Sequence, residues 1–164
     1  MNPCSLECAS PTSDVDSLAY AEIGARRGPE TILLVEDDAI VRTAAGEVLA
    51  SAGYNIVAAS SAAEALSNCI QVSQGIDLLL VDMVMPAMSG LDLADKFKIL
   101  FPRGRVLLMS GHAEQVVAHT RIAYRRPDDA IACLAKPFSG SVLMKKVRET
   151  LDAKPWTPEC LSDS

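Results

Sequence analysis

The chain has 164 residues, of which 49% are apolar and 22% are charged, and its formal net charge is −6. This length and apolar content fit one globular domain with a single hydrophobic core. The negative charge argues against binding to nucleic-acid phosphates, so we expect no direct DNA binding. No apolar run approaches the roughly 18 residues that cross a bilayer, and the first residues lack the basic start and apolar stretch of a signal peptide. We therefore expect a cytoplasmic protein that makes no membrane contact.

The five cysteines are irregularly spaced, at positions 4, 8, 69, 133 and 160. Thiols stay reduced in the cytoplasm, so we expect free cysteines that are incidental to the structure. Cys4 and Cys8 are near enough in sequence to share a metal or a disulfide, but the sequence offers no second ligand pair to complete a metal site.

The predicted elements begin after a polar lead. Residues 1–28 are rich in Ser, Pro, Asp and Gly and have no sustained periodicity, so we expect a flexible N-terminal extension. The folded domain is predicted to span 29–153. Residues 154–164 contain two prolines and are expected to form a flexible C-terminal tail.

The first half of the domain alternates strands and helices. The branched apolar run 31–35 predicts a buried strand, and 55–59 predicts a second one. Between them lies a helix that ends just before Gly53. Its inward face is formed by Val41, Ala45, Val48, Leu49 and Ala52. Ser60 or Ser61 then caps a second helix. The inward positions of this second helix are Ala62, Ala65, Leu66, Cys69 and Ile70.

The second half continues the alternation. Further strands are predicted over 77–82, 105–110 and 131–135. Further helices are predicted over 90–100, 113–123 and 139–153. The inward residues of the last helix are Val142, Leu143, Val147 and Leu151. Short strands that are apolar throughout indicate a parallel sheet with helices on both faces, so the fold class is a doubly wound α/β domain.

Polar residues gather where the predicted strands end. They are Glu36, Asp37 and Asp38 after the first strand, Asp82 at the end of the third, Ser110 and Gly111 at the fourth, and Lys136 after the fifth. Because the carboxyl ends of parallel strands meet at one edge of the sheet, we expect these groups to form one site. Asp38 is the member most suited to cap the following helix.

The acids of this group repel one another unless a cation binds between them. Mg²⁺ prefers carboxylate and carbonyl oxygens, together with water and phosphate. We therefore expect Mg²⁺ to be bound by Glu36, Asp37, Asp82 and the backbone carbonyl of Val84.

A carboxylate beside such an ion is able to attack phosphorus and form an aspartyl phosphate, which gives a reason for Asp82 at the end of an apolar strand. The transferring phosphoryl group carries negative charge on three oxygens. Lys136, the Ser110 hydroxyl and the backbone N–H groups near Val84 and Gly111 are the groups expected to bind these oxygens.

Four segments, ILLVEDD, LLLVDMVMPAMSG, VLLMSG and AKPF, occur in this order at the predicted strand ends. With them the chain, from about Thr31 to Asp152, resembles the receiver domain of two-component response regulators. The resemblance implies a flavodoxin-like, five-stranded parallel sheet in the order 2-1-3-4-5. It also implies that the phosphodonor is a phosphohistidine on a histidine kinase or a phosphotransfer protein.

The resemblance assigns roles to individual residues as well. It implies that Asp82 is the phosphoacceptor and that Glu36 and Asp37 are the acidic pair for Mg²⁺. Ser110 takes the place of the switch hydroxyl, and Lys136 that of the phosphate-binding lysine. The peptide bond from Lys136 to the following proline is expected to be cis.

Two features depart from the family pattern. Cys133, three residues before Lys136, occupies the position of the switch aromatic, and a small thiol cannot swing in and out as a ring does. We expect this thiol to be buried and inert. The stretch from Ser110 to Lys136 is also longer than the common receiver spacing. The segments MSGHAE and AKPF are most similar to receivers associated with hybrid histidine kinases.

These observations favour a phosphorylation-switched signalling domain that catalyses only its own phosphorylation and dephosphorylation. Phosphorylation of Asp82 is expected to change which downstream protein binds the face formed by the helix 113–123 and the strand 131–135. The surface from the helix 113–123 to the helix 139–153 is the expected surface of a homodimer. The short tail after the last helix predicts that no output domain is attached.

Three alternatives remain open at this point. The first is the terminal receiver of a hybrid histidine kinase or an intermediate of a phosphorelay. The second is a Mg²⁺ phosphohydrolase, and the third is a protein-interaction domain with a degenerate site. Val84 argues against the hydrolase, because such enzymes place a second aspartate there as general acid.

Overall fold

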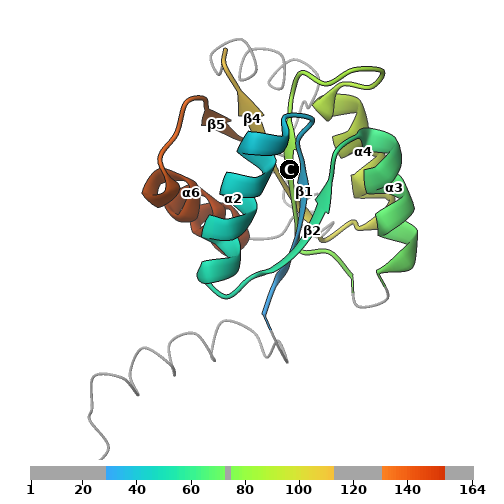
Figure 1. The fold of residues 1–164 in the computed structure, drawn as a ribbon. Helices are drawn as coiled ribbons and strands as arrows, with labels where there is room; N and C mark the ends of the chain where they lie inside the picture. The colour runs from blue at the N-terminus through green and yellow to red at the C-terminus, as the bar shows by residue number, and fades with distance from the viewer. Residues whose placement is uncertain (1–28, 73–74, 113–130, 154–164) are drawn as a thin grey trace, which may run out of the picture.

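Figure 1 shows the computed structural model of the chain, which describes residues 29–72, 75–112 and 131–153. Its centre is a five-stranded sheet in the order β2-β1-β3-β4-β5, in which all neighbouring strands are parallel. The strands are β1 (Thr31–Val35), β2 (Asn55–Ala59), β3 (Leu78–Asp82), β4 (Arg105–Ser110) and β5 (Ala132–Ala135). The predicted fold class and strand order are confirmed.

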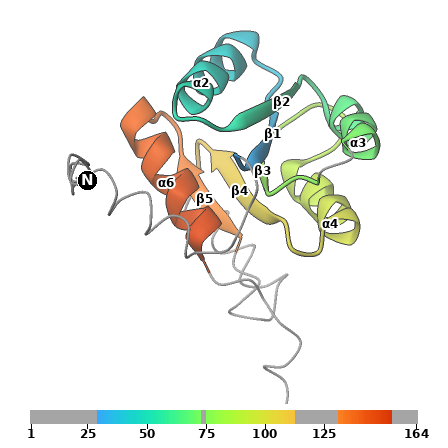
Figure 2. The ribbon, with the colours of Figure 1, turned by 90° about the horizontal axis from the view of Figure 1, so that it is seen from below.

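Helices cover both faces of the sheet, as Figure 2 shows from below. Helices α2 (Ala39–Ser51) and α6 (Gly140–Asp152) lie on one face, and α3 (Ala62–Gln71) and α4 (Gly90–Leu100) lie on the other. Each begins after a residue whose side chain accepts hydrogen bonds from the free N–H groups of the first turn. These cap residues are Asp38, Ser61, Ser89 and Ser139.

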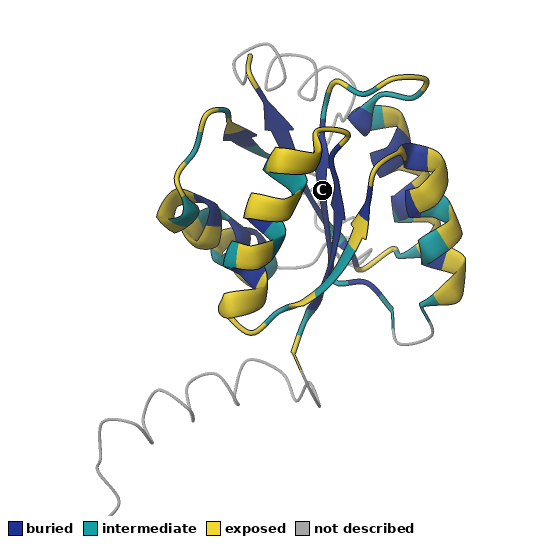
Figure 3. Ribbon diagram, viewed as in Figure 1, coloured by how far each residue is buried: buried dark blue, intermediate teal, exposed yellow. Residues whose placement is uncertain are grey.

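The central strands are buried on both sides, so the core has two layers (Figure 3). Successive residues of a strand point to opposite faces. The layer beneath α3 and α4 contains Leu33, Val35, Leu79, Val81 and Leu108. The layer beneath α2 and α6 contains Ile32, Leu34, Leu78, Leu80, Leu107 and Met109. This double burial explains why the strands are continuously apolar and do not alternate with polar residues.

Two strands start one residue later than predicted, β3 at Leu78 and β5 at Ala132. The residue before β3 has a separate role. The Asp77 carboxylate accepts a hydrogen bond of 2.8 Å from the backbone N–H of Thr31, at the beginning of β1. Asp77 therefore helps to fix the register of the two central strands from outside the ladder.

Three residues that were predicted to face inward are exposed. Ile70 is 83% exposed and Val142 is 50% exposed, while Ala52 is the exposed C-cap of α2. The buried stripe of a helix is narrow when the helix lies flat on a sheet, because each residue turns the side chain by about 100°. In α3 the stripe holds Ala62, Ala65 and Cys69, which rotates Ile70 toward solvent.

Several predictions fall outside the described residues. They concern the helix over 113–123, the extension 1–28 and the tail 154–164. Among the helices that are described, none has both the length and the apolar character needed to cross a membrane.

Candidate functional site

The candidate site lies at the carboxyl ends of the strands, where the chain reverses its direction of travel across the sheet. From β1 the chain passes to β2 on one side, and β3 then lies on the other side of β1. Such a switch point leaves a crevice between the loops that follow the two central strands. Glu36 and Asp37 follow β1, and Asp82 ends β3.

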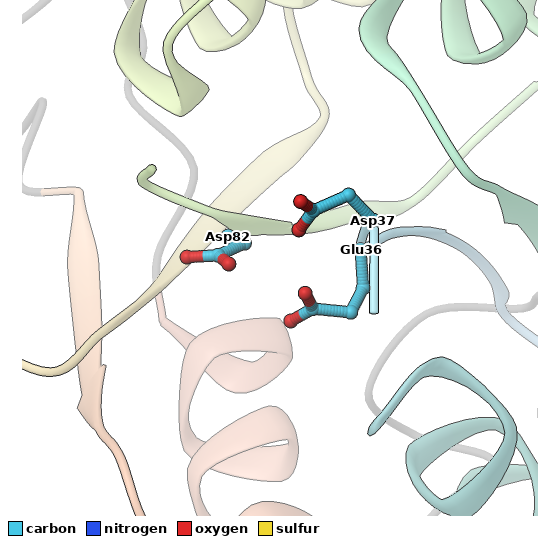
Figure 4. Close-up of side chains that lie close together, drawn as sticks. All are labelled: Glu36, Asp37 and Asp82. Atoms are coloured by element: carbon cyan, nitrogen blue, oxygen red, sulfur yellow. The ribbon is translucent and has the colours of Figure 1, made fainter. Parts of the chain in front are cut away.

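Three carboxylates meet in this crevice (Figure 4). Glu36, Asp37 and Asp82 each offer one oxygen, and these oxygens lie within 4.8 Å of one another. Glu36 is 1% exposed and Asp82 9%, whereas Asp37 is exposed. Burial raises the pKa of Glu36 above its ordinary value; the hydrogen bond from Lys136 opposes this shift, and repulsion from Asp82 adds to it.

Lys136, which directly follows the edge strand β5, contacts two of these carboxylates. Its Nζ donates to Glu36 Oε2 at 2.7 Å and to Asp82 Oδ2 at 3.1 Å. Burial acts to lower the pKa of Lys136, but the hydrogen bonds to Glu36 and Asp82 outweigh it, so the pKa is raised. Lys136 is therefore an ammonium at neutral pH. It is held between Glu36, which follows β1, and Asp82, which ends β3. The bond from Lys136 to Pro137 is cis, as predicted.

The loop after β3 holds Asp82 through the backbone. The N–H of Val84 donates to Asp82 Oδ1 at 3.2 Å, and the N–H of Gly90 donates to the carbonyl of Met83 at 3.0 Å. A Cβ on Gly90 would lie 2.5 Å from the backbone oxygen of Asp82, which is closer than atoms pack. Glycine at position 90 thus allows the first turn of α4 to approach the phosphoacceptor candidate.

Ser110 ends β4, the strand next to β3. It is 3% exposed, and its Oγ accepts a hydrogen bond of 3.0 Å from the N–H of His112. Its carbonyl accepts from the N–H of Lys136 at 2.8 Å, which ties the ends of β4 and β5 together. Gly111 has open space where a side chain would stand, so its backbone is accessible.

Cys133 lies on β5 beside Leu108 of β4 and is half-buried against the core layer under α3 and α4. Burial raises the pKa of its thiol. The predicted burial is only partial, and the inert role of this thiol stays a prediction.

One residue that contacts the site, Arg42, was not predicted from the sequence. Arg42, in α2, donates from Nη1 to the backbone carbonyl of Glu36 at 2.7 Å. A signal for it was available in the sequence, because a basic residue near the start of a helix opposes the helix dipole and calls for an explanation. The contact between Lys136 and Glu36 was also missed, since the reach of a side chain across the sheet cannot be read from residue spacing.

The donor set fits a hard divalent cation. Three carboxylate oxygens are gathered at one point, and one ammonium faces them. Within the described ranges the Asp37 carboxylate has no hydrogen-bond or ion-pair partner of its own. Mg²⁺ binds through such oxygens and retains water at its open positions.

An apolar pocket of about 530 Å³ adjoins the site between α2 and α6. Lys136 lies on its wall, so the pocket and the acidic crevice share a residue. The apolar lining includes Ile40, Val41, Val48, Pro137, Phe138 and Leu143. Ile40 is 81% exposed at the rim of this pocket.

Comparison with known families gives one match that covers most of the described domain. The model of the response regulator receiver domain matches residues 32–148. Among solved structures, the receiver domain from the hybrid histidine kinase CckA is similar with a TM-score of 0.61 and 28% identity, over 74% of this chain and 98% of that one.

Two curated relatives differ in length. The sensor kinase CckA of Brucella abortus (strain 2308) is 34% identical over 125 residues, which are 76% of this chain but 13% of that protein. The sporulation initiation phosphotransferase F of Bacillus subtilis (strain 168) is 29% identical over 125 residues, which are 76% of this chain and 96% of that protein. The same kind of domain thus occurs both alone and as a small part of a long sensor kinase.

Proposed function

The chain belongs to the response regulator receiver domain family of two-component systems, and from this premise we propose that Asp82 is its phosphoacceptor. The donor is a phosphohistidine on a histidine kinase or a phosphotransfer protein. The observation that supports this best is the meeting of Glu36, Asp37 and Asp82 within 4.8 Å, with the Lys136 ammonium bound to two of them.

Mg²⁺, which is typical of the family, is held in this proposal by Glu36, Asp37, Asp82 and the backbone carbonyl of Val84. When bound there, the ion offsets the charge of the carboxylates and of the transferring phosphoryl oxygens. The unpartnered Asp37 carboxylate supports this role, because it is the acid whose oxygens are not already occupied by donors of the described residues.

In the transfer step, one Asp82 oxygen forms a bond to phosphorus while the P–N bond of the phosphohistidine breaks. The ring nitrogen keeps the bonding electron pair, and the ring, protonated at its other nitrogen, leaves as neutral imidazole. Lys136 donates to the phosphoryl oxygens from the position in which it now donates to Asp82. The Ser110 hydroxyl and the N–H groups of Val84 and Gly111 complete the phosphate-binding set.

The donor protein docks at the apolar pocket between α2 and α6. The phosphohistidine has to come within bonding distance of Asp82, so the donor must cover the surface around the crevice. The pocket shares Lys136 with the site and presents Ile40, which is 81% exposed. An apolar ridge of a donor helix is the partner that suits this lining.

Phosphorylation then changes which protein the domain binds, with Ser110 as the switch hydroxyl and Cys133 at the position where the family has its switch aromatic. The partner and homodimer surface proposed from the sequence includes residues 113–130, which lie outside the described ranges. We propose that output comes from such a partner, or from other domains if the chain is the receiver of a hybrid kinase. The small share of CckA that the chain matches keeps both arrangements open.

Intact-mass spectrometry tests the central claim. The wild type, Asp82→Asn and a control, Glu47→Gln, are incubated with acetyl phosphate with and without Mg²⁺. Glu47 is an exposed acid of α2 outside the site. We expect a Mg²⁺-dependent gain of one phosphoryl group in the wild type and the control, and none in Asp82→Asn. Equal labelling of Asp82→Asn would overturn the assignment.

A pair of matched variants tests the docking surface. Ile40→Glu places a charge beside the pocket, and Ile99→Glu places one on α4, on the opposite face of the sheet, where Ile99 is 78% exposed. We expect Ile40→Glu to slow phosphotransfer from a histidine kinase at least tenfold, with labelling by acetyl phosphate unchanged. The Ile99→Glu protein should behave as wild type in both assays, and equal rates for the two variants with the kinase would contradict this docking site.

A further inference from the structure

Arg42 contacts the candidate site through the backbone and not through the acids themselves. Its Nη1 donates to the carbonyl of Glu36 at 2.7 Å and lies 3.5 Å from the carbonyl of Asp37. These are the two residues that lead from β1 into the cap of α2. One guanidinium thus spans the backbone of both acids of the loop.

The place of Arg42 in its helix argues that helix stability is not its purpose. Helix α2 begins at Ala39, so Arg42 lies at the end of the first turn, near the positive end of the helix dipole. A cation there interacts unfavourably with the helix dipole. Its half-buried side chain folds back over the cap to reach the loop carbonyls instead of extending into solvent.

The loop needs an external support because its own hydrogen bonds leave Asp37 free. The N–H of Glu36 donates to the carbonyl of Ala59 at 3.2 Å, which extends the β1–β2 ladder by one residue. Asp38 is fixed as the helix cap. Between them, Asp37 is exposed, and its carboxylate has no partner among the described residues. The direction of this carboxylate therefore depends on the backbone that Arg42 holds.

We propose that Arg42 is a positioning residue of the cation site, which keeps the Glu36–Asp37 backbone in the conformation that points the Asp37 carboxylate at Asp82. This inference rests on the proposed function, because it supposes that the three carboxylates bind Mg²⁺. Residues that orient metal ligands typically contribute 10- to 100-fold to metal affinity.

Because Arg42 is charged, the direction of the change in Mg²⁺ affinity on its substitution tests the proposal. A guanidinium close to a cation site repels the ion, so removal of its charge alone should tighten Mg²⁺ binding. Removal of its hydrogen bonds should release the loop and weaken Mg²⁺ binding. The two effects act in opposite directions, and positioning is established if the weakening dominates.

Isothermal titration calorimetry with MgCl₂ on the unphosphorylated chain measures this directly. Arg42→Met keeps the aliphatic stem without donors or charge, and Arg42→Lys keeps the charge and a single donor nitrogen at similar reach. Arg103→Met is the control, because it removes an exposed arginine that precedes β4 at the other end of the sheet. Arg42→Gln, which loses the charge and the reach, serves as a second loss variant, and circular dichroism checks the folding of each protein.

We expect the Kd for Mg²⁺ to rise about tenfold in Arg42→Met and in Arg42→Gln, and to stay within about threefold of wild type in Arg42→Lys and Arg103→Met. An unchanged or lower Kd in folded Arg42→Met or Arg42→Gln overturns the inference and leaves the proposed function standing. If the wild type itself binds no Mg²⁺, both the proposed function and this inference are overturned.

Discussion

Two charged clusters at opposite ends of the sheet differ in how fully their charges are paired. The site cluster, at the carboxyl ends of the strands, consists of Glu36, Asp37, Asp82 and Lys136. The basal cluster, at the amino ends, consists of Glu30, Tyr54, Arg148 and Asp152. Three carboxylates face one ammonium in the site cluster, whereas two carboxylates and a phenol surround one guanidinium in the basal cluster.

Arg148 satisfies each of its neighbours in the basal cluster. Its Nε donates to both oxygens of Asp152 at 3.0 Å, and its Nη2 and Nη1 donate to the two oxygens of Glu30 at 3.0 and 3.3 Å. Its Nη1 also donates to the Tyr54 hydroxyl at 3.3 Å. Led by the hydrogen bonds to Asp152, these contacts raise the pKa of Arg148. The guanidinium fork thus joins the segment before β1, the start of β2 and the end of α6.

The difference in charge pairing indicates that the basal cluster stabilises the fold and that the site cluster is suited to bind a ligand. In the basal cluster both carboxylates and the phenol are bonded to one guanidinium, which joins the segment before β1, the residue before β2 and α6. Both clusters have more carboxylates than cations, but the ratio is three to one in the site cluster and two to one in the basal cluster. Two of the site acids, Glu36 and Asp82, are buried, so repulsion between them opposes folding. A domain tolerates such an arrangement where a ligand supplies the missing positive charge, which is the pattern expected of a functional site.

The largest effect is expected from Lys136→Met, which removes the cation from the site cluster. Glu36 is 1% exposed and would lose its ion-pair partner, so the free energy of unfolding should fall by about 3 kcal/mol in metal-free buffer. Because a divalent ion can replace the lost positive charge, Mg²⁺ should restore part of this loss. Urea unfolding with EDTA and with MgCl₂ measures both. If the variant is as stable as wild type in EDTA, the ion pair with Glu36 is unimportant for stability.

A smaller loss is expected from Arg148→Met, about 1 kcal/mol, because Arg148 and Asp152 are 32% and 44% exposed and water screens part of their interaction. This loss should be the same with and without MgCl₂, and labelling of Asp82 by acetyl phosphate should stay at the wild-type level. Lys146→Met is the matched control on the same helix, since its pair with Glu149 is long, at 3.9 Å, and exposed. A Mg²⁺-dependent loss in Arg148→Met would show that the two clusters are coupled.

Asp37→Asn tests the excess charge itself. The substitution removes one of the three mutually repelling carboxylates, so the variant should be more stable than wild type in EDTA by about 0.5 kcal/mol. In MgCl₂ the order should reverse, because the wild type gains stability by binding the ion and the variant binds it weakly. Thermal unfolding in the two buffers records the crossover. A wild type that remains less stable than Asp37→Asn at saturating MgCl₂ would argue against Asp37 as a ligand.

The two clusters also differ in how far the sequence predicts them. Glu36, Asp37, Asp82 and Lys136 each lie at or just after the end of an apolar strand, and parallel strands bring such positions to one edge, so their meeting was predictable before the structure. The five strands were predictable for the same reason, because runs such as LLLV at the start of β3 are apolar on both faces. The cap at Asp38 was predictable from the residue type.

The basal cluster has only one local signal, the i,i+4 spacing of Arg148 and Asp152. Its other contacts, from Arg148 to Glu30 and to Tyr54, span 118 and 94 residues and depend on where α6 ends on the folded sheet. The same limit applies to Arg42 and to the contact between Lys136 and Glu36, which side-chain reach determines. Residue patterns therefore predict which strand end carries a group, but not which groups touch.

The smallest effect is expected from Tyr54, whose titration distinguishes the basal cluster at alkaline pH. Burial raises the pKa of the Tyr54 hydroxyl above its ordinary value of 10.0, against the lowering effect of Arg148. A raised pKa in the folded state means that the native protein holds the proton more tightly than the unfolded chain does, so stability is intact below pH 10 and falls as the pH rises through the pKa of the folded state.

Tyr54→Phe has no hydroxyl proton to lose at alkaline pH. The difference in unfolding free energy between wild type and Tyr54→Phe should therefore be constant from pH 7 to about pH 9.5 and shift by a few tenths of a kcal/mol against the wild type by about pH 11. Urea unfolding across this range measures the shift, with absorbance of the ionised phenol as an independent reading. A constant difference up to pH 11 would mean that Tyr54 ionises equally well in the folded and unfolded chain, and that its place in the basal cluster is one of packing alone.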